Sequence, residues 1–309
     1  MNNGKISSAS EIFLSNIGGL NRQAREIFEA RVCEVSLYAE TLAGELSPLL
    51  FDGLSLGEAL SVIGRLDLRG EEEQTDSLID ASCYFKTLSS FDRAELSRQL
   101  VFRLSSLGNR LSLGELYATG ADGSSVCYVR NALSDEAFDV FSQQNELSVG
   151  YVGSFDEAAR AVRDGEYGYC ILPLEEAGGV RSRRIMNMLR ELSLKIVAVT
   201  PVFGYDGSAD MKYALVSQGL CEPTLSGDDE LYVDLLLSLG DSSAMSGLLT
   251  GCEALGFLHT RSSQSVTPSG EAFTSLVLRA DGGRLTELIL YLTLFYEGFE
   301  LIGVYKNLE

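Results

Sequence analysis

The chain has few of the residues that build disulfide frameworks, metal sites or catalytic histidine sites. Its 309 residues include one histidine and six cysteines, and no two cysteines are spaced as C-x-x-C. Cysteines scattered in this way predict neither a disulfide framework nor a zinc site, and are typical of small buried apolar residues. For His259, an ordinary strand position is favoured over catalysis or metal binding. We therefore expect no metal ion and no cofactor.

Long apolar segments are also missing. No apolar run approaches the roughly 18 residues that a membrane-spanning helix needs. The N-terminal sequence MNNGKISSASE lacks the basic and apolar pattern of a secretion signal. We therefore expect a soluble, cytoplasmic protein with no membrane partner.

Positive charge is scarce. The chain has 24 Lys and Arg residues against 44 Asp and Glu residues, a formal net charge of -20. Nucleic acids and anionic membranes require a basic surface, so we expect neither as a partner. An anionic small molecule is also disfavoured, unless arginines are concentrated locally.

The length predicts two or three domains, and 45% hydrophobic residues are enough for ordinary cores. The Gly- and Ser-rich stretch from Leu107 to Ser125 is typical of a linker, and CEPTLSGDD, from Cys221 to Asp229, is typical of a hinge. These breaks predict domains at residues 1–118, 124–222 and 227–309.

The first domain has a helical pattern. Apolar residues recur at helical spacing from Ser10 to about Leu46, and Pro48 is expected to end that helix. Two more helices are predicted, from Leu56 to Leu66 and from Glu72 to about Leu107, and Ser89 could interrupt the last one. The domain is therefore expected to be all-α.

A strand, helix and strand follow one another between Val149 and Glu176. A helix between two apolar strands requires a parallel crossover, so this segment predicts an α/β unit. Ligands of such sheets collect at the carboxyl ends of the strands. At the end of the second strand stand Pro173, Glu175, Glu176, Gly178 and Gly179.

The sequence EYGYCILPLEEAGG, from Glu166 to Gly179, resembles a motif of prephenate dehydratases, in which an acidic Asp-Tyr-Gly step leads into a strand ending in Pro-Ile-Glu-Asn-Ser. Tyr167, Gly168, Pro173 and Glu175 match, whereas the Asn and Ser have become Glu176 and Ala177. The resemblance implies a dehydratase-like catalytic role for Glu175.

The chain departs from that family in two places. The threonine-containing Thr-Arg-Phe strand of the family corresponds to Met211, Lys212 and Tyr213, so the hydroxyl acid is missing. The family's second lobe is also missing, because only FGYDGSAD separates Val202 from this strand. We therefore expect one α/β lobe without a closed cleft.

The last 80 or so residues predict a βαββαβ order, which is the ferredoxin-like plan. This region resembles the ACT domain that ends prephenate dehydratases and senses phenylalanine, and Gly303 and Tyr305 match its closing strand. The predicted elements are a strand at Glu230–Leu239, a helix at Ala244–Leu255, strands at Leu258–Val266 and Phe273–Ala280, a helix at Arg284–Tyr296 and a strand at Phe299–Lys306.

The same resemblance implies a ligand site for an aromatic amino acid or a shikimate-pathway metabolite. Two family motifs, Gly-Ala-Leu and Glu-Ser-Arg-Pro, form that site, and only Ala244 and Ser263 survive unchanged here. A site at these positions would therefore differ from the family's site. The candidate ligand-binding residues are Ser243, Ala244, Met245, Ser262, Ser263 and Gln264.

The three predicted helices resemble the chorismate mutase domain that precedes the dehydratase in bifunctional enzymes, over the segment from Ile17 to Asp52. Arg31 matches the central arginine, but Leu14 and Leu42 replace two further cations, and one cation cannot clamp a dianion. For Arg31, a mutase-like role is therefore less favoured than an exposed ion pair with Glu34.

Four arginines cluster after the dehydratase-like motif. They could bind an anion, but on so acidic a chain a solvated helix face is favoured. They lie in a helix predicted from Arg181 to Leu192: Arg181, Arg183, Arg184 and Arg190.

Two interpretations of function follow. The first is a non-catalytic relative of the bifunctional chorismate mutase-prephenate dehydratase, with a regulatory or metabolite-sensing role. The second is a working enzyme of phenylalanine biosynthesis with substituted catalytic residues. The number of missing groups favours the first. The long first helix and the edges of the ferredoxin-like sheet predict a homodimer or a higher homo-oligomer.

Overall fold

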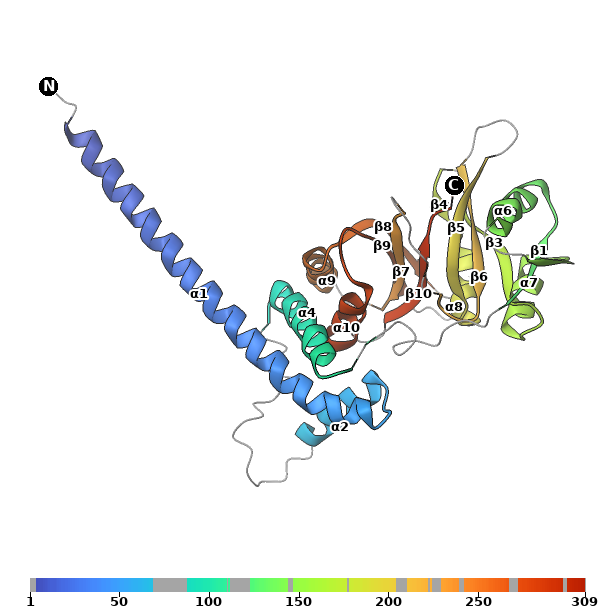
Figure 1. Cartoon of the computed structure of the whole chain (residues 1–309). Coiled ribbons are helices and arrows are strands. Elements are labelled where there is room, and N and C mark those ends of the chain that lie inside the picture. Colours follow the sequence, from blue (N-terminus) through green and yellow to red (C-terminus); the bar gives the residue numbers. More distant parts are fainter. Residues whose placement is uncertain are drawn as a thin grey trace. The chain divides into compact units, whose positions relative to one another are not determined.

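The computed structural model describes residues 4–68, 88–109, 111, 123–143, 147–176, 178–203, 210–221, 223, 229–238, 242–266, 272–296 and 299–308 (Figure 1). The chain divides into two compact units, Met1–Arg110 and Leu111–Glu309. Within the described ranges, no helix combines the length and the apolar character needed to cross a membrane.

The first unit contains α1 (Gly4–Phe51), α2 (Leu56–Leu68) and α4 (Ser90–Ser106). Helix α1 packs against both other helices, and its buried residues recur every three or four positions. On α4, apolar residues four positions apart form the matching stripe. The two stripes consist of Val35, Ala39, Leu42 and Leu46 on α1, and Leu96, Leu100 and Leu104 on α4.

The prediction that Pro48 ends the first helix is wrong, because α1 continues through it to Phe51. Proline removes only its own N–H, and near the end of a helix that costs one backbone bond while the preceding turns stay intact. The Pro48 carbonyl still accepts a hydrogen bond from the Asp52 amide at 3.0 Å.

Helix α4 begins directly after Ser89, the residue at which the sequence predicted a possible interruption of the third helix. The Ser89 hydroxyl accepts a hydrogen bond from the Asp92 amide at 3.2 Å, and the Asp92 carboxylate accepts one from the Ser89 amide at 3.2 Å. This reciprocal capping box fixes the start of the helix. The earlier part of that predicted helix, from Glu72 onward, lies outside the described residues up to residue 87.

The second unit begins with an α/β arrangement. Strands β2 and β3 both run parallel to β1, which lies between them, so the predicted parallel crossover through α7 is confirmed. Gly165, with φ 78°, follows the end of α7 as predicted. The elements are β1 (Ser125–Val129), α6 (Ala132–Ser142), β2 (Ser148–Val152), α7 (Phe155–Arg163), β3 (Tyr169–Glu176), β4 (Val180–Arg181), α8 (Arg183–Glu191), β5 (Lys195–Phe203) and β6 (Asp210–Ser217).

The unit ends with strands and helices in the order βαββαβ. The four strands are antiparallel neighbours in the order β10-β7-β9-β8, so the first and last strands of this group lie side by side. The elements are β7 (Leu231–Leu237), α9 (Ser242–Ala254), β8 (Phe257–Val266), β9 (Ala272–Ala280), α10 (Leu285–Phe295) and β10 (Phe299–Lys306).

All these strands form one mixed ten-stranded sheet, in the order β2-β1-β3-β6-β5-β10-β7-β9-β8, with β4 beside β3. The sheet crosses the predicted boundary between residues 222 and 227, because β5 and β10 pair in parallel. Ile196 and Gly303 are the paired residues, and the Leu308 amide donates to the Val199 carbonyl at 2.7 Å. The expected mixed α/β architecture is present, while division at that boundary remains a proposal.

The main core spans both halves of this sheet. Val162 of α7 and Leu189 of α8 belong to one buried cluster with Leu236, Ile302 and Tyr305 from the C-terminal strands. Helix α6 packs into a different cluster, which includes Tyr128 and Phe141. Because the larger cluster contains residues from both halves, these halves are stabilised together.

The described cysteines are all free, as the sequence predicts. Three are buried and Cys221 is half-buried, but Cys33 is exposed on α1, where the prediction of burial is wrong. Cys83 lies outside the described residues. The buried cysteines are Cys127, Cys170 and Cys252.

Replacing Gly303→Ala should destabilise the junction between β5 and β10. An added Cβ would lie 2.7 Å from the Ile196 Cβ and 2.9 Å from its carbonyl oxygen. We expect a loss of about 1–3 kcal/mol in the free energy of unfolding, measured in urea, because overpacking forces the backbone apart. Amide hydrogen exchange should accelerate in β5 and β10.

The matched control is Gly57→Ala, since nothing lies within 4 Å of a Cβ added on the surface of α2. This substitution should be neutral or slightly stabilising. If amide protection in β10 is unchanged in the Gly303→Ala protein, the close pairing of β5 with β10 at Gly303 is contradicted.

Candidate functional site

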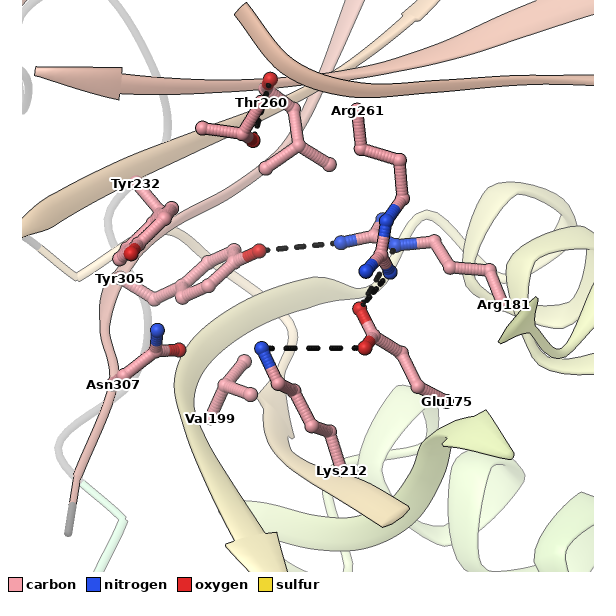
Figure 2. Close-up of a pocket in the computed structure, with 10 residues that line it drawn as sticks. Glu175, Arg181, Val199, Lys212, Tyr232, Thr260, Arg261, Tyr305 and Asn307 are labelled. Atoms are coloured by element: carbon pink, nitrogen blue, oxygen red, sulfur yellow. Dashed lines mark hydrogen bonds and ion pairs between the residues drawn. The ribbon is translucent and has the colours of Figure 1, made fainter. Parts of the chain in front are cut away.

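A cavity of about 180 Å³ lies at the carboxyl end of β3, where C-terminal strands face it (Figure 2). Both halves of the sheet contribute to its walls. Its polar lining consists of Glu175, Arg181, Lys212, Tyr232, Thr260, Arg261, Tyr305 and Asn307. The apolar lining residues are Val199 and Val277.

The sequence predicted a single lobe without a closed cleft. The missing second lobe stays a prediction, and the cavity at the end of β3 has residues of the C-terminal strands in its lining. Arg261 of β8 donates a hydrogen bond to Glu175 of β3, although five other strands separate these two in the sheet order. The sheet must therefore curl, so that its C-terminal edge lies opposite β3. In this way residues of the C-terminal strands line one side of the cavity.

Glu175 lies at the centre of the site and is 5% exposed. Figure 2 shows its carboxylate between Arg261 and Lys212. Its Oε1 accepts from Arg261 Nη1 and lies 3.8 Å from Arg181 Nε, and its Oε2 lies 4.0 Å from Lys212 Nζ. A carboxylate whose oxygens already contact three cations has little free access to a substrate proton.

Arg181 is not on a solvated helix face, so that prediction is wrong for this residue. Helix α8 starts at Arg183, and Arg181 lies in β4, paired with Glu175 of β3. Its side chain is 4% exposed, donates from Nη1 to Asp234 Oδ2, and donates from Nη2 to the Tyr305 hydroxyl at 3.2 Å. The short strand, which the helical pattern concealed, turns this arginine inward.

The other arginines of that cluster behave differently. Arg183 and Arg184 are exposed, and Arg184 forms an ion pair with Asp156. The Arg190 guanidinium lies over the Phe273 ring at 5.2 Å from its centroid. For Arg183 and Arg184 the expected solvated face is confirmed.

Asp234 is the buried partner of Arg181. Burial raises the pKa of the Asp234 carboxyl against the opposing effect of Arg181. Burial alone lowers the pKa of Arg181, but Asp234 and Tyr305 outweigh it and raise that pKa above its usual value. Among the described residues, Arg181 Nε and Asp234 Oδ1 have no hydrogen-bond partner. The pair is therefore tightly held but incompletely satisfied.

Sequence reasoning could have found Asp234. It is the single charge in the apolar strand LYVDLLL, and a charge inside such a strand requires a buried partner. Which cation pairs with it could not be predicted, because Arg181 lies 53 residues earlier in the chain.

The site has an excess of positive charge. Arg181, Lys212 and Arg261 face the two carboxylates of Glu175 and Asp234, which leaves one positive charge in excess when all are ionised. The chain as a whole has a net charge of -20. This is the local concentration of cations that an anionic ligand requires on so acidic a protein.

The hydroxyl groups of the cavity are weak proton donors at neutral pH. Burial and Glu230 raise the pKa of Tyr232 to about 12, and burial raises the pKa of Tyr305 further. The Thr260 hydroxyl donates to the Val277 carbonyl at 3.0 Å. In the described ranges, no cluster of three or more His, Cys, Asp or Glu residues could bind a metal ion. The arrangement is therefore better suited to binding than to proton transfer.

The six ligand-binding residues predicted from the ACT-like motifs do not line this cavity. Ser262, Ser263 and Gln264 follow Arg261 on β8, and Ala244 and Met245 lie half-buried near the start of α9. The side chain of Ser243 lies outside the described residues. Their role in binding stays a prediction.

Arg31 lies in the first unit. Its guanidinium pairs with Glu34 at 2.8 Å and lies 3.4 Å from Asp92. Leu42 is buried, whereas the side chain of Leu14 lies outside the described residues. His259 is exposed on β8.

Removing Arg181 should strongly destabilise the second unit. In Arg181→Met, Asp234 is left as a buried charge without its partner, which we expect to cost about 3–5 kcal/mol in urea unfolding. The double variant Arg181→Met/Asp234→Leu should recover most of this loss. Arg184→Met, which removes an exposed ion pair, should cost at most about 1 kcal/mol. A double variant as unstable as the single one would contradict the pairing.

No model of a known protein family matches this sequence, and no curated protein matches it. Among solved structures, the chain is similar to prephenate dehydratase from Streptococcus mutans, at 15% identity and a TM-score of 0.48 over 60% of this chain and 99% of that chain. A prephenate dehydratase from Arthrobacter aurescens, in complex with L-Phe, has 14% identity and a TM-score of 0.44, over 59% of this chain and 89% of that chain. A quorum-quenching acylase, GqqA, has 18% identity and a TM-score of 0.45, over 59% of this chain and 95% of that chain.

Proposed function

We propose that this chain is a non-catalytic relative of the bifunctional chorismate mutase-prephenate dehydratases, and that it binds a small metabolite without converting it. The observation that carries this proposal is the state of Glu175, whose carboxylate contacts Arg261, Arg181 and Lys212. A dehydratase also needs an acid to protonate the leaving hydroxyl. The family's Thr-Arg-Phe strand corresponds here to Met211, Lys212 and the buried Tyr213. Burial raises the pKa of Tyr213, which makes its hydroxyl a weaker acid.

The helical unit supports the same proposal. Leu42, at the position of a mutase cation, is buried in the stripe that α1 presents to α4. A charged group there would disrupt the packing unless it were paired. Arg31 is engaged with Glu34 and Asp92, which reduces its availability to a dianionic substrate. The unit is better suited to packing than to clamping chorismate.

The ligand class follows from the sequence resemblance together with the charge of the cavity. We propose an aromatic amino acid or another shikimate-pathway metabolite, bound by the second unit for sensing or regulation. The one positive charge in excess around Glu175 supports, among these ligands, a metabolite with one negative charge over a zwitterionic amino acid. In this proposal the C-terminal βαββαβ region acts as an ACT-like regulatory part.

Turnover measurements test the absence of catalysis. The purified chain should convert neither chorismate nor prephenate faster than a control without protein at the same neutral pH. Arg31→Ala should leave the rates unchanged. Conversion at about 1 per second or faster, an ordinary enzyme rate, would restore the alternative of a working enzyme.

Thermal unfolding tests the binding half of the proposal. Chorismate, prephenate, phenylpyruvate and aromatic amino acids should be compared, because any ligand that binds the native state raises the midpoint of unfolding by mass action. At least one should stabilise the chain, by about 2.7 kcal/mol at a concentration of 100 times its Kd. If none does, the metabolite-binding role is lost.

We also propose a homodimer or a higher homo-oligomer. Strands β2 and β8 end the sheet, and unpaired strand edges favour pairing with a second copy. Strand β10, in contrast, already pairs with β5 of the same chain. Light scattering of the full chain should give at least twice the mass of one chain, and a single-chain mass would exclude self-association.

A further inference from the structure

We propose that the cavity at the end of β3 binds one small monocarboxylic acid, with the ligand carboxylate between Lys212 and Arg261. Both residues line the cavity, and their side chains are 34% and 36% exposed. This inference rests on the proposed function, because it specifies the ligand of the same site. It differs from that proposal in naming the charge of the ligand and the two residues that hold it.

Lys212 has unused donors. Its Nζ lies 4.0 Å from Glu175 Oε2, which is an ion pair beyond hydrogen-bonding distance. An ammonium group has three N–H donors, and among the described residues none of these is hydrogen bonded to protein. Lys212 lines the cavity together with Tyr305 and Asn307 (Figure 2). An anionic oxygen in that space would receive a charge-assisted hydrogen bond.

Arg261 supplies the second contact. Its Nη1 donates to Glu175, which uses one of the five N–H donors of the guanidinium. A Cβ added at Gly179 would lie 3.4 Å from Arg261 Nη2, so the guanidinium lies against the glycine turn after β3. Guanidinium groups bind carboxylates through parallel N–H donors. Arg261 can therefore hold Glu175 and a ligand carboxylate at once.

Charge balance selects a ligand with a single negative charge. The five ionisable groups leave one positive charge in excess, which one carboxylate neutralises. A dicarboxylate would leave a negative charge in a site where Glu175 and Asp234 are already buried. A zwitterion would leave the excess unchanged. Uncompensated charge is costly beside the buried groups Glu175, Arg181 and Asp234.

The volume limits the body of the ligand. Cavities for drug-sized ligands measure about 300–1,000 Å³, whereas a cavity of about 150 Å³ admits benzene. The present cavity of about 180 Å³ is close to the second value. Val199 and Val277 provide apolar contacts. The expected ligand is therefore a carboxylate on an apolar group of about the size of one aromatic ring.

Calorimetric titration of the full chain tests this ligand class with four probes of similar size. Benzoate carries one negative charge, benzamide none, phthalate two, and L-phenylalanine is zwitterionic. Benzoate should bind about 10-fold to 100-fold more tightly than benzamide, because benzamide lacks the charge that strengthens the two contacts. It should also bind more tightly than phthalate and L-phenylalanine. Equal or tighter binding of any of the other three, or no binding of benzoate at millimolar concentration, would overturn the inference.

Variants of the two cations test the residues. Lys212→Met and Arg261→Met should each weaken benzoate binding about 10-fold to 100-fold, and Lys212→Arg should retain most of it. Arg183→Met is the matched control, because it removes one positive charge from an exposed position outside the cavity. The midpoint of thermal unfolding reports whether each variant is folded. If Arg261→Met unfolds, Lys212→Met decides alone, and unchanged benzoate affinity in that variant overturns the inference.

The two proposals fail in different ways. If benzoate binds with the same affinity to the wild-type chain and to Lys212→Met, while L-phenylalanine or prephenate still stabilises the chain, the monocarboxylate site is wrong and metabolite binding stands. If prephenate is converted, the non-catalytic proposal is wrong while the benzoate titration still decides the ligand contact.

Discussion

The buried ion pair between Arg181 and Asp234 connects the two halves of the second unit. Arg181 comes from the short strand β4 and Asp234 from the interior strand β7, and the same guanidinium contacts Glu175 and Tyr305. A buried pair adds little to stability compared with apolar residues of the same size, but losing one member is costly. Here the ion pair determines position. It holds the Arg181 guanidinium next to Glu175, and it keeps the end of β3 facing the C-terminal strands.

The continuous sheet makes this arrangement possible. Gly303 lets β10 approach Ile196 of β5 closely, so the C-terminal βαββαβ region extends the sheet of the α/β part instead of standing apart from it. The curl of the sheet then brings β8 opposite β3. The cavity is thus lined by residues from both halves of the sheet.

The proposal that the cavity binds a ligand without turnover has a physical basis. General acid-base catalysis needs a group that gains and loses a proton near neutral pH. Glu175 is surrounded by cations, and the pKa values of Tyr232 and Tyr305 are raised. The cations of the cavity hold the Glu175 carboxylate. The one positive charge that remains in excess can attract the anion of a ligand.

Local patterns in the sequence determined the heptad-like packing of α1, the parallel crossover through α7, the βαββαβ order and the place of Glu175 at a strand end, because each depends on periodicity or on neighbours in the chain. The same patterns misplaced Arg181 on a helix and ended α1 at Pro48. Only the tertiary structure decided the site, because the partners of Arg181 and Glu175 lie 53 and 86 residues away in sequence. Pairing between residues so far apart in sequence depends on the curl of the whole sheet. The spacing of residues within a single helix or strand cannot predict it.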